Sequence, residues 1–160
     1  MMIPKECYRM YGSDLDACSR QENEGCSVCP CLEEGEVVWE ISKEVEIAIA
    51  HYLPNHPGKC KFLHGHSLIV EVTVSGFELN NQGMLVDFGD LKKLVTEEVV
   101  DVLDHTCLND LLEVPTVELL AKYLYNKLAI HFDSYEDMRV LMKSVTIKES
   151  STSKVKYYKK

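Results

Sequence analysis

Two long stretches of alternating sequence constrain this chain most, because each predicts a β-strand with histidine at one end. In residues 37–51 the odd positions are mostly apolar, and the even positions up to residue 46 are mostly polar or charged. In residues 64–74 the first two even positions are histidines, and the later even positions are apolar. Side chains two residues apart share one face of a strand, so His51, His64 and His66 all fall on apolar faces. An antiparallel hairpin across the turn-rich loop between the strands brings the three imidazoles together.

The rest of the chain predicts two helices and two further strands. Asp87 or Asp90 can cap a first helix, whose apolar positions have helical spacing and are Leu91, Leu94, Val95, Val102 and Leu103. Residues 104–110 interrupt this helix, and Pro115 with Thr116 begins a second one over residues 117–128. Residues 139–149 and 155–158 predict two more strands. The order β-β-α-α-β-β predicts an α+β fold, with a four-stranded antiparallel sheet and two helices on one face.

Composition and charge exclude several classes of protein. With 160 residues, 46% of them hydrophobic, the chain suits one domain with a substantial core. No apolar run approaches the roughly 20 residues that span a bilayer, and the first residues lack the order of a secretory signal. We therefore expect a cytoplasmic protein with no membrane partner. A formal net charge of -9 argues against a nucleic-acid partner.

Residues 1–35 predict a cysteine-rich N-terminal extension that precedes a domain over residues 36–160. They show no periodicity and contain five of the seven cysteines, namely Cys7, Cys18, Cys26, Cys29 and Cys31. The spacing Cys26-x-x-Cys29 is typical of a pair of metal ligands, but a second well-formed pair is missing. Two hypotheses stay open for this segment: a second, structural metal site or a tail that binds no metal.

Three histidines and one cysteine predict a metal-dependent enzyme. Three neutral imidazoles with one open coordination position form the usual catalytic zinc site. Cys60 precedes His64 by four residues, so its thiol can lie beside such a metal without binding it and can carry a proton. The alternative is that these residues are ordinary histidines and a buried thiol. The convergence of three imidazoles on one face disfavours that alternative.

Six motifs follow one another in the chain: Ala50-His51, Cys60-x-x-x-His64-Gly65-His66, Gly83-Met84-Leu85-Val86-Asp87-Phe88, Leu103-Asp104-His105 with Leu108-Asn109, Pro115-Thr116-Val117-Glu118, and Ile147-Lys148-Glu149. Together they resemble the 6-pyruvoyl-tetrahydropterin synthase superfamily over about residues 38–158. The three residues between Cys60 and His64 resemble its bacterial branch, the 6-carboxytetrahydropterin synthases, because the pyruvoyl-producing animal branch has a longer insert there. The chain departs from both branches in residues 1–35, and from a family variant with glutamate in place of the cysteine.

The resemblance implies a role for each site residue. It assigns the binding of Zn²⁺ to His51, His64 and His66. It makes Cys60 the catalytic cysteine, with Asp104 and His105 completing a proton relay, although Asp104 could instead cap a helix. Glu149 would anchor the pterin through two parallel hydrogen bonds. Thr116 would contact the pterin, although helix capping explains Thr116 equally well.

The resemblance also implies an activity and an assembly. The substrate would be 7,8-dihydroneopterin triphosphate, and the products 6-carboxy-7,8-dihydropterin, acetaldehyde and triphosphate, in the synthesis of queuosine and 7-deazapurine precursors. The family fold is the tunnelling fold, in which trimers form a barrel, two trimers commonly pair, and active sites lie between subunits. A homo-oligomer, either a trimer or a hexamer, is therefore expected. Two alternatives are a pyruvoyl-producing synthase and a non-catalytic zinc-binding module.

Overall fold

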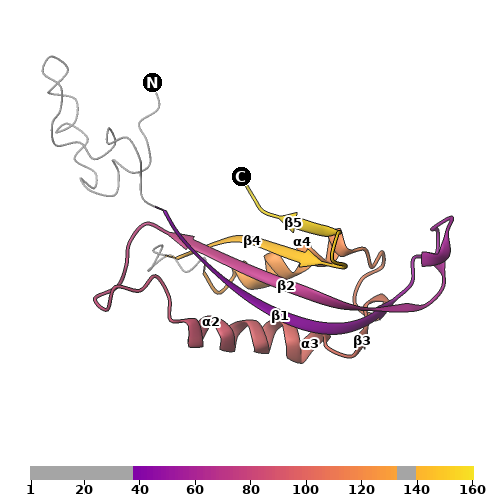
Figure 1. Ribbon diagram of the computed structural model, residues 1–160, viewed down its shortest axis with the longest axis horizontal. Helices are drawn as coiled ribbons and strands as arrows, with labels where there is room; N and C mark the ends of the chain where they lie inside the picture. The colour runs from indigo at the N-terminus through magenta and orange to yellow at the C-terminus, as the bar shows by residue number, and fades with distance from the viewer. Residues whose placement is uncertain (1–37, 133–139) are drawn as a thin grey trace, which may run out of the picture. The chain divides into compact units, whose positions relative to one another are not determined.

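The alternating sequence forms a long β-hairpin at the centre of the sheet (Figure 1). The computed structural model describes residues 38–132 and 140–160. Within it β1 (Trp39–His51) pairs antiparallel with β2 (His64–Gly76), in a register that runs from Trp39 opposite Gly76 to His51 opposite His64. The predicted pairing is confirmed, and it places the three histidines at one end of the hairpin. The loop that closes this end contains a short 3₁₀ helix, η4 (Lys59–Lys61).

Three further strands complete the sheet, one more than the sequence predicts. β4 (Leu141–Lys148) pairs antiparallel with β2, and β5 (Lys154–Tyr157) pairs antiparallel with β4. β3 (Thr106–Cys107) pairs in parallel with Ile49 and Ala50 of β1, which gives the order β3-β1-β2-β4-β5. The prediction of four purely antiparallel strands is therefore wrong. Two residues are too few to show alternation, so only the contact with β1 identifies β3 as a strand.

Both helices begin after a predicted capping residue. The Asp87 carboxylate accepts a hydrogen bond from the Gly89 N–H at the start of α2 (Phe88–Val95). The Thr116 hydroxyl accepts one from the Leu119 N–H at the start of α4 (Val117–Ala129). α2 continues through a π-helical segment, η5 (Thr96–Val100), into α3 (Asp101–Leu103), and a second 3₁₀ turn, η6 (Leu108–Asp110), follows β3. Capping satisfies N–H groups that a helix start otherwise leaves unpaired.

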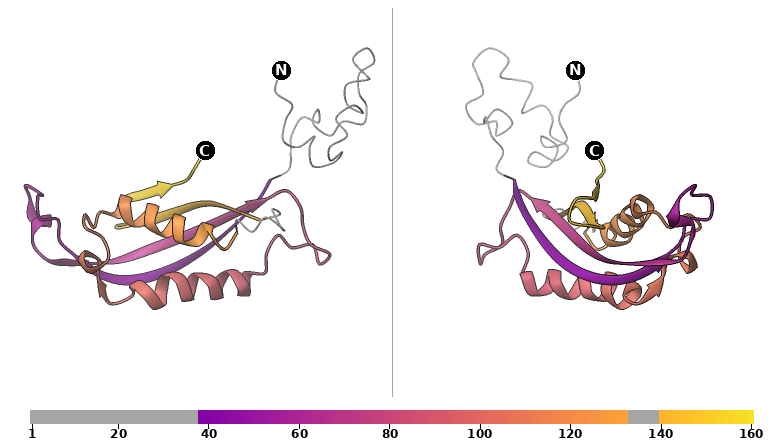
Figure 2. Two further views of the ribbon diagram at one scale, coloured as in Figure 1. Left: turned by 180° about the vertical axis from the view of Figure 1, so that it is seen from behind. Right: turned by 45° about the vertical axis from the view of Figure 1, so that its right-hand side comes forward.

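The helices run along one face of the sheet, as Figure 2 shows, and the core lies between the two layers. Apolar side chains from both layers form one buried cluster, which includes Ile47, Val70, Val145, Val95 and Leu124. The predicted helix faces are confirmed except at one position. Val102 is 40% exposed, whereas Val99 is buried. A π-helical turn contains more residues than an α-helical turn, so η5 rotates the buried face away from the positions that a 3.6-residue period predicts.

Some predictions fall on parts of the chain outside the described residues. They are the domain boundary at residues 35 and 36 and the cysteines Cys7, Cys18, Cys26, Cys29 and Cys31. Both hypotheses for the N-terminal segment therefore stay predictions. Among the described residues, no helix has the length and apolar character that crossing a membrane requires.

Candidate metal centre and adjoining cleft

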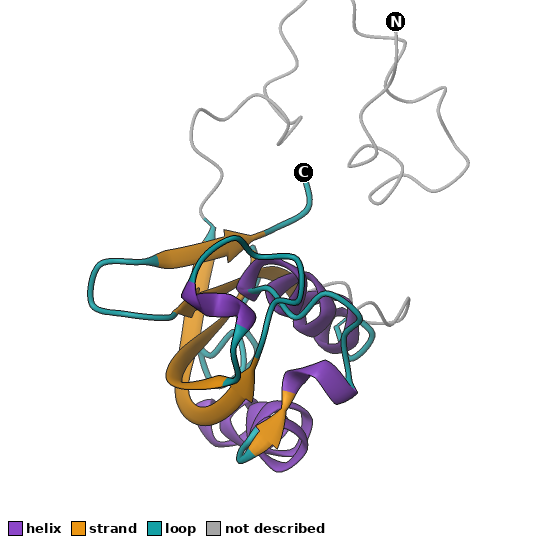
Figure 3. Ribbon diagram, turned by 90° about the vertical axis from the view of Figure 1, so that its right-hand side faces the viewer, coloured by secondary structure: helices purple, strands orange, loops and turns teal. Residues whose placement is uncertain are grey.

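Three imidazoles meet at the end of the central hairpin that faces the viewer in Figure 3. His51 is the last residue of β1, His64 lies opposite it as the first residue of β2, and His66 follows on the same face. The ring centroids lie 4.6, 5.2 and 5.0 Å apart. One ligating atom from each residue lies within 4.8 Å of the others. The cluster thus follows directly from the register of the hairpin.

Hydrogen bonds at two Nδ1 atoms leave the opposite ring nitrogens available to a metal. The His51 Nδ1 lies 2.7 Å from the Pro115 carbonyl oxygen, and the His64 Nδ1 lies 2.7 Å from the Phe62 carbonyl oxygen. A carbonyl oxygen only accepts hydrogen bonds, so each neutral ring protonates Nδ1 and keeps a lone pair on Nε2. The Nε2 atoms of His51 and His66 are buried and have no hydrogen-bond partner. Such orphaned atoms are rare, and a metal ion held by three imidazoles would satisfy them.

The surroundings of His66 favour its neutral form. Burial lowers the pKa of His66, and the nearby Glu149 carboxylate acts in the opposite direction without cancelling that effect. The Glu149 Oε1 lies 3.6 Å from the His66 Nε2, a distance too long for a hydrogen bond. A lowered pKa favours the unprotonated imidazole, and this is the form that binds metals.

A cleft of about 570 Å³ opens beside the histidine cluster. It is lined by His51, Leu53, Cys60, Thr116, Val117, Glu118, Ile147, Glu149, Thr152, Ser153, Lys154 and Val155. Cys60 comes from η4, Thr116 caps α4, and Glu149 directly follows β4. The structure therefore brings these three predicted site residues together with His51. A hollow in which polar groups from several elements converge beside apolar side chains is typical of a small-molecule site.

Two parts of this site were not identified from the sequence. The turn between β4 and β5 lines the cleft and is closed by a 3.0 Å hydrogen bond from the Glu149 N–H to the Ser153 carbonyl. The run of serine and threonine in residues 150–153 is the signal that could have indicated this turn. The other part is the Pro115 carbonyl that orients His51. A main-chain carbonyl leaves no signature in a sequence.

The structure places Asp104 and His105 away from the cleft lining, at the β3 edge of β1. The Asp104 Oδ2 lies 3.0 Å from the His105 Nδ1. The Asp104 Oδ1 accepts a 2.7 Å hydrogen bond from the Ala48 N–H, and the His105 N–H donates one of 2.7 Å to the Ala48 carbonyl. The hydrogen bond from the Ala48 N–H lowers the pKa of the Asp104 carboxyl below its ordinary value, and the contact with His105 lowers it further. The His105 side chain is 82% exposed and its φ is 59°, a backbone conformation uncommon outside glycine.

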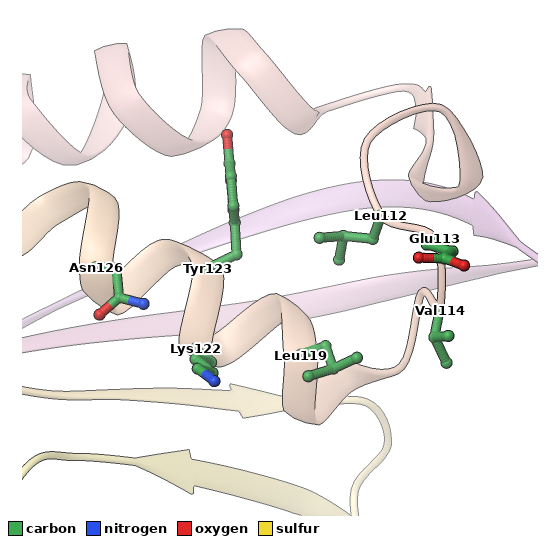
Figure 4. Close-up of a pocket in the computed structure, with 7 residues that line it drawn as sticks. All are labelled: Leu112, Glu113, Val114, Leu119, Lys122, Tyr123 and Asn126. Carbon is green, nitrogen blue, oxygen red and sulfur yellow. The ribbon is translucent and has the colours of Figure 1, made fainter.

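A smaller hollow of about 330 Å³ lies between α4 and the loop before it (Figure 4). Its lining residues are Leu112, Glu113, Val114, Leu119, Lys122, Tyr123 and Asn126. Among these described residues there is no histidine, no cysteine and no predicted site residue. We therefore place the chemistry at the histidine cluster and its cleft.

Comparison with known proteins gives one consistent result. The family model for 6-pyruvoyl tetrahydropterin synthase matches residues 40–160. The 6-carboxy-5,6,7,8-tetrahydropterin synthase of Bacillus subtilis is 36% identical over 124 residues, which cover 72% of this chain and 82% of the relative. The enzyme of the same name from Synechocystis is 38% identical over 128 residues, which cover 76% of this chain and 94% of the relative.

Solved structures share the fold. The 6-pyruvoyl tetrahydropterin synthase of Caenorhabditis elegans superposes with a TM-score of 0.66 at 24% sequence identity, covering 78% of this chain and 97% of the other. The Plasmodium falciparum protein of the same name gives a TM-score of 0.60 at 22% identity, covering 76% of this chain and 98% of the other. At these identities the likeness concerns the fold alone.

Proposed function

The chain belongs to the 6-pyruvoyl tetrahydropterin synthase family, and we propose that it makes 6-carboxytetrahydropterin from 7,8-dihydroneopterin triphosphate. The observation that carries this proposal is the cleft that joins His51 of the histidine cluster to Cys60 and Glu149. The names of the bacterial relatives support the carboxylated product. The three residues between Cys60 and His64 support the same branch. The pathway that fits this product is queuosine and 7-deazapurine precursor synthesis.

Electron balance decides the oxidation state of the product ring. Splitting the three-carbon side chain into a carboxylate and acetaldehyde removes two electrons from its carbons, and triphosphate leaves as the third product. The dihydropterin ring accepts those electrons and becomes a tetrahydropterin, as the names of the relatives state. One water supplies the additional carboxylate oxygen. We therefore propose the tetrahydropterin product in place of the dihydropterin that the sequence resemblance implies.

We propose Zn²⁺ as the metal that His51, His64 and His66 bind. Three neutral imidazoles suit this ion, and the buried Nε2 atoms of His51 and His66 have no hydrogen-bond partner among the described residues. When bound, the metal would act as a Lewis acid toward the side-chain oxygens of the substrate.

The residues of the cleft have distinct proposed tasks. Glu149 accepts two parallel hydrogen bonds from the amino group and ring N–H of the pterin, and Thr116, which also lines the cleft, contacts the pterin. The apolar side chains of Leu53, Ile147 and Val155 cover the ring and exclude water. The Cys60 thiol carries protons to and from the substrate side chain, next to the histidine cluster.

We propose that a neighbouring copy of the chain supplies Asp104 and His105. Within one chain this pair does not line the cleft, and the exposed His105 ring points away from the core. The Asp104 carboxylate fixes the imidazole through Nδ1, so the His105 Nε2 is left to exchange a proton with the substrate. The protein is then a homo-oligomer with sites between subunits, as a trimer or hexamer of the family fold would provide.

The test is incubation of the purified, zinc-loaded protein with 7,8-dihydroneopterin triphosphate, followed by mass spectrometry. The expected products are 6-carboxytetrahydropterin and acetaldehyde. A pyruvoyl-tetrahydropterin product would move the protein to the other branch of the family. Release of neither product from the loaded protein would support the alternative of a non-catalytic metal-binding module.

A further inference from the structure

The side chain of Asn109 forms a two-pronged bridge to the backbone at the end of β1. Its Oδ1 accepts a 3.0 Å hydrogen bond from the Tyr52 N–H, and its Nδ2 donates a 3.0 Å hydrogen bond to the Tyr52 carbonyl. Both main-chain groups of Tyr52 are therefore held by one carboxamide. The Cys107 thiol also lies 3.8 Å from the same Oδ1, within the range of a weak S–H···O contact.

This bridge continues the parallel pairing of β3 with β1. Ile49 lies opposite Thr106 and Ala50 opposite Cys107, so the same register places Tyr52 opposite Asn109. At that point the chain has already turned into η6, and the backbone of Asn109 is not in the sheet. Its carboxamide offers one acceptor and one donor in place of a strand's C=O and N–H. The side chain thus makes the pair of hydrogen bonds to β1 that the backbone of Asn109 does not make.

Tyr52 lies between the histidine cluster and the loop that carries Cys60. The residue before it is His51, whose ring nitrogen belongs to the histidine cluster. The residue after it is Leu53, whose N–H donates a 2.8 Å hydrogen bond to the Cys60 carbonyl and closes the loop that carries this cysteine. Leu53 and Cys60 both line the cleft. Any displacement of Tyr52 therefore moves a metal ligand on one side and the thiol on the other.

We propose that Asn109 is a positioning residue that fixes His51 and the Cys60 loop relative to each other. This inference rests on the metal site and the role of Cys60 in the proposed function. Asn109→Ala removes both hydrogen bonds. Asn109→Asp keeps the size of the side chain and the acceptor for the Tyr52 N–H, but places an oxygen against the Tyr52 carbonyl in place of the donor. A role in packing alone would leave Asn109→Asp like the parent protein.

The test uses the full chain and two readouts that need no substrate. The first is Co²⁺ binding followed by visible absorbance, after subtraction of the spectrum of the variant in which His51, His64 and His66 are all Ala. This subtraction removes any contribution of the N-terminal cysteines. Asn109→Ala should weaken Co²⁺ binding at the histidines about tenfold, as loss of an outer-shell partner typically does. Asn109→Asp should also weaken it and alter the absorbance bands.

The second readout is the rate at which iodoacetamide alkylates Cys60 in the metal-free protein, measured on the peptide that contains it. Without the bridge the loop opens more often, so both Asn109 variants should react faster, by about tenfold for Asn109→Ala. Asn80→Ala is the matched control. The Asn80 Oδ1 accepts hydrogen bonds of 2.9 and 3.0 Å from the N–H groups of Gln82 and Met84, beyond the far end of β2. This variant should leave both readouts at parent values.

Parent-like Co²⁺ spectra and Cys60 alkylation in Asn109→Asp would overturn the proposal, even if Asn109→Ala failed to fold. Equal effects of Asn80→Ala and Asn109→Ala on both readouts would also overturn it, because they would indicate a general loss of stability. Absence of pterin turnover would count against the proposed reaction only. If the parent bound no Co²⁺ at the histidines, the proposed metal would fall, and the alkylation rates would still decide the role of Asn109.

Discussion

At the scale of single residues, hydrogen bonds to ring nitrogens decide which atoms can bind a metal. The carbonyls of Pro115 and Phe62 hold the Nδ1 protons of His51 and His64, so the Nε2 lone pairs converge instead of the N–H groups. His66 joins them with a lowered pKa and a buried Nε2. The three residues can therefore serve as one donor set for a metal ion, and removal of any member leaves two imidazoles in place of three.

We expect that replacing His51, His64 or His66 with Ala sharply reduces the zinc content of the purified protein. Elemental analysis of protein dialysed against a weak chelator measures this. His56→Ala and His131→Ala are matched controls, because both residues lie outside the cluster, and they should retain the metal. Full zinc occupancy in the triple variant that also lacks residues 1–35 would contradict the assignment.

Cys60→Ala should keep the metal and the fold but lose most turnover. A general acid or base typically contributes about 100- to 10,000-fold to a rate, and Cys60 is the one thiol among the described residues that line the cleft. Steady-state rates with 7,8-dihydroneopterin triphosphate measure the loss. Near-normal turnover in Cys60→Ala would show that another group carries the proton.

Glu149→Gln should weaken pterin binding by roughly ten- to a hundredfold, because a hydrogen bond to a charged group is lost and a misplaced donor replaces one acceptor. Titration of the zinc-loaded protein with sepiapterin or biopterin measures the affinity, and zinc content should not change. Glu118→Gln provides the comparison, since Glu118 is the other carboxylate that lines the cleft. If Glu118→Gln alone weakened binding, the pterin anchor would lie on α4.

At the scale of secondary-structure elements, the strands and helix starts follow from local sequence, and the exceptions follow from contacts. Alternation predicts β1 and β2, and the capping residues Asp87 and Thr116 predict where α2 and α4 begin. β3 has only two residues and exists because it meets the edge of β1. The period of 3.6 residues does not predict the π-helical η5 either, so it places Val102 on the buried face although Val102 is exposed.

The π-helical segment predicts a difference between two identical substitutions. Val99→Ala should destabilise the protein by about 2 kcal/mol, because it removes buried methyl groups and leaves a cavity. Val102→Ala, at a position 40% exposed, should change the free energy of unfolding by less than about 0.5 kcal/mol. Urea titrations of both variants measure the difference. Equal destabilisation would mean that η5 does not rotate the helix face in solution.

At the scale of the whole molecule, the described chain separates its site residues between two places. Cys60, Thr116 and Glu149 line the cleft with His51, whereas Asp104 and His105 lie at the β3 edge of β1. The sequence indicates which residues have catalytic side chains. It does not indicate whether residues from two copies of the chain form one site. The described sheet has β5 at one edge, and at the other β3 covers only Ile49 and Ala50 of β1. Such edges can pair with further copies.

Mixing two inactive variants tests whether a site draws on two chains. Cys60→Ala and His105→Ala should each lack most activity alone. In oligomers co-expressed from equal amounts of both, a site between neighbours has an even chance of an intact Cys60 and, independently, an even chance of an intact His105. About a quarter of parent activity should therefore return if the subunits form a cyclic ring and mix at random. If one chain supplied both residues, mixing would restore nothing.

The reciprocal mixture controls for assembly and expression. Here the parent chain is co-expressed with a chain that carries both Cys60→Ala and His105→Ala, and native mass spectrometry gives the ratio of the two chains in the oligomers. A site shared between neighbours again retains about a quarter of parent activity, because both contributing chains must be intact, whereas a site within one chain retains about half. Together the two mixtures distinguish shared from separate sites even when the absolute rates differ. If both mixtures retain about a quarter of parent activity, His105 acts on the cleft of a neighbouring copy. If the first mixture has no activity and the second retains about half, Cys60 and His105 act together within each chain.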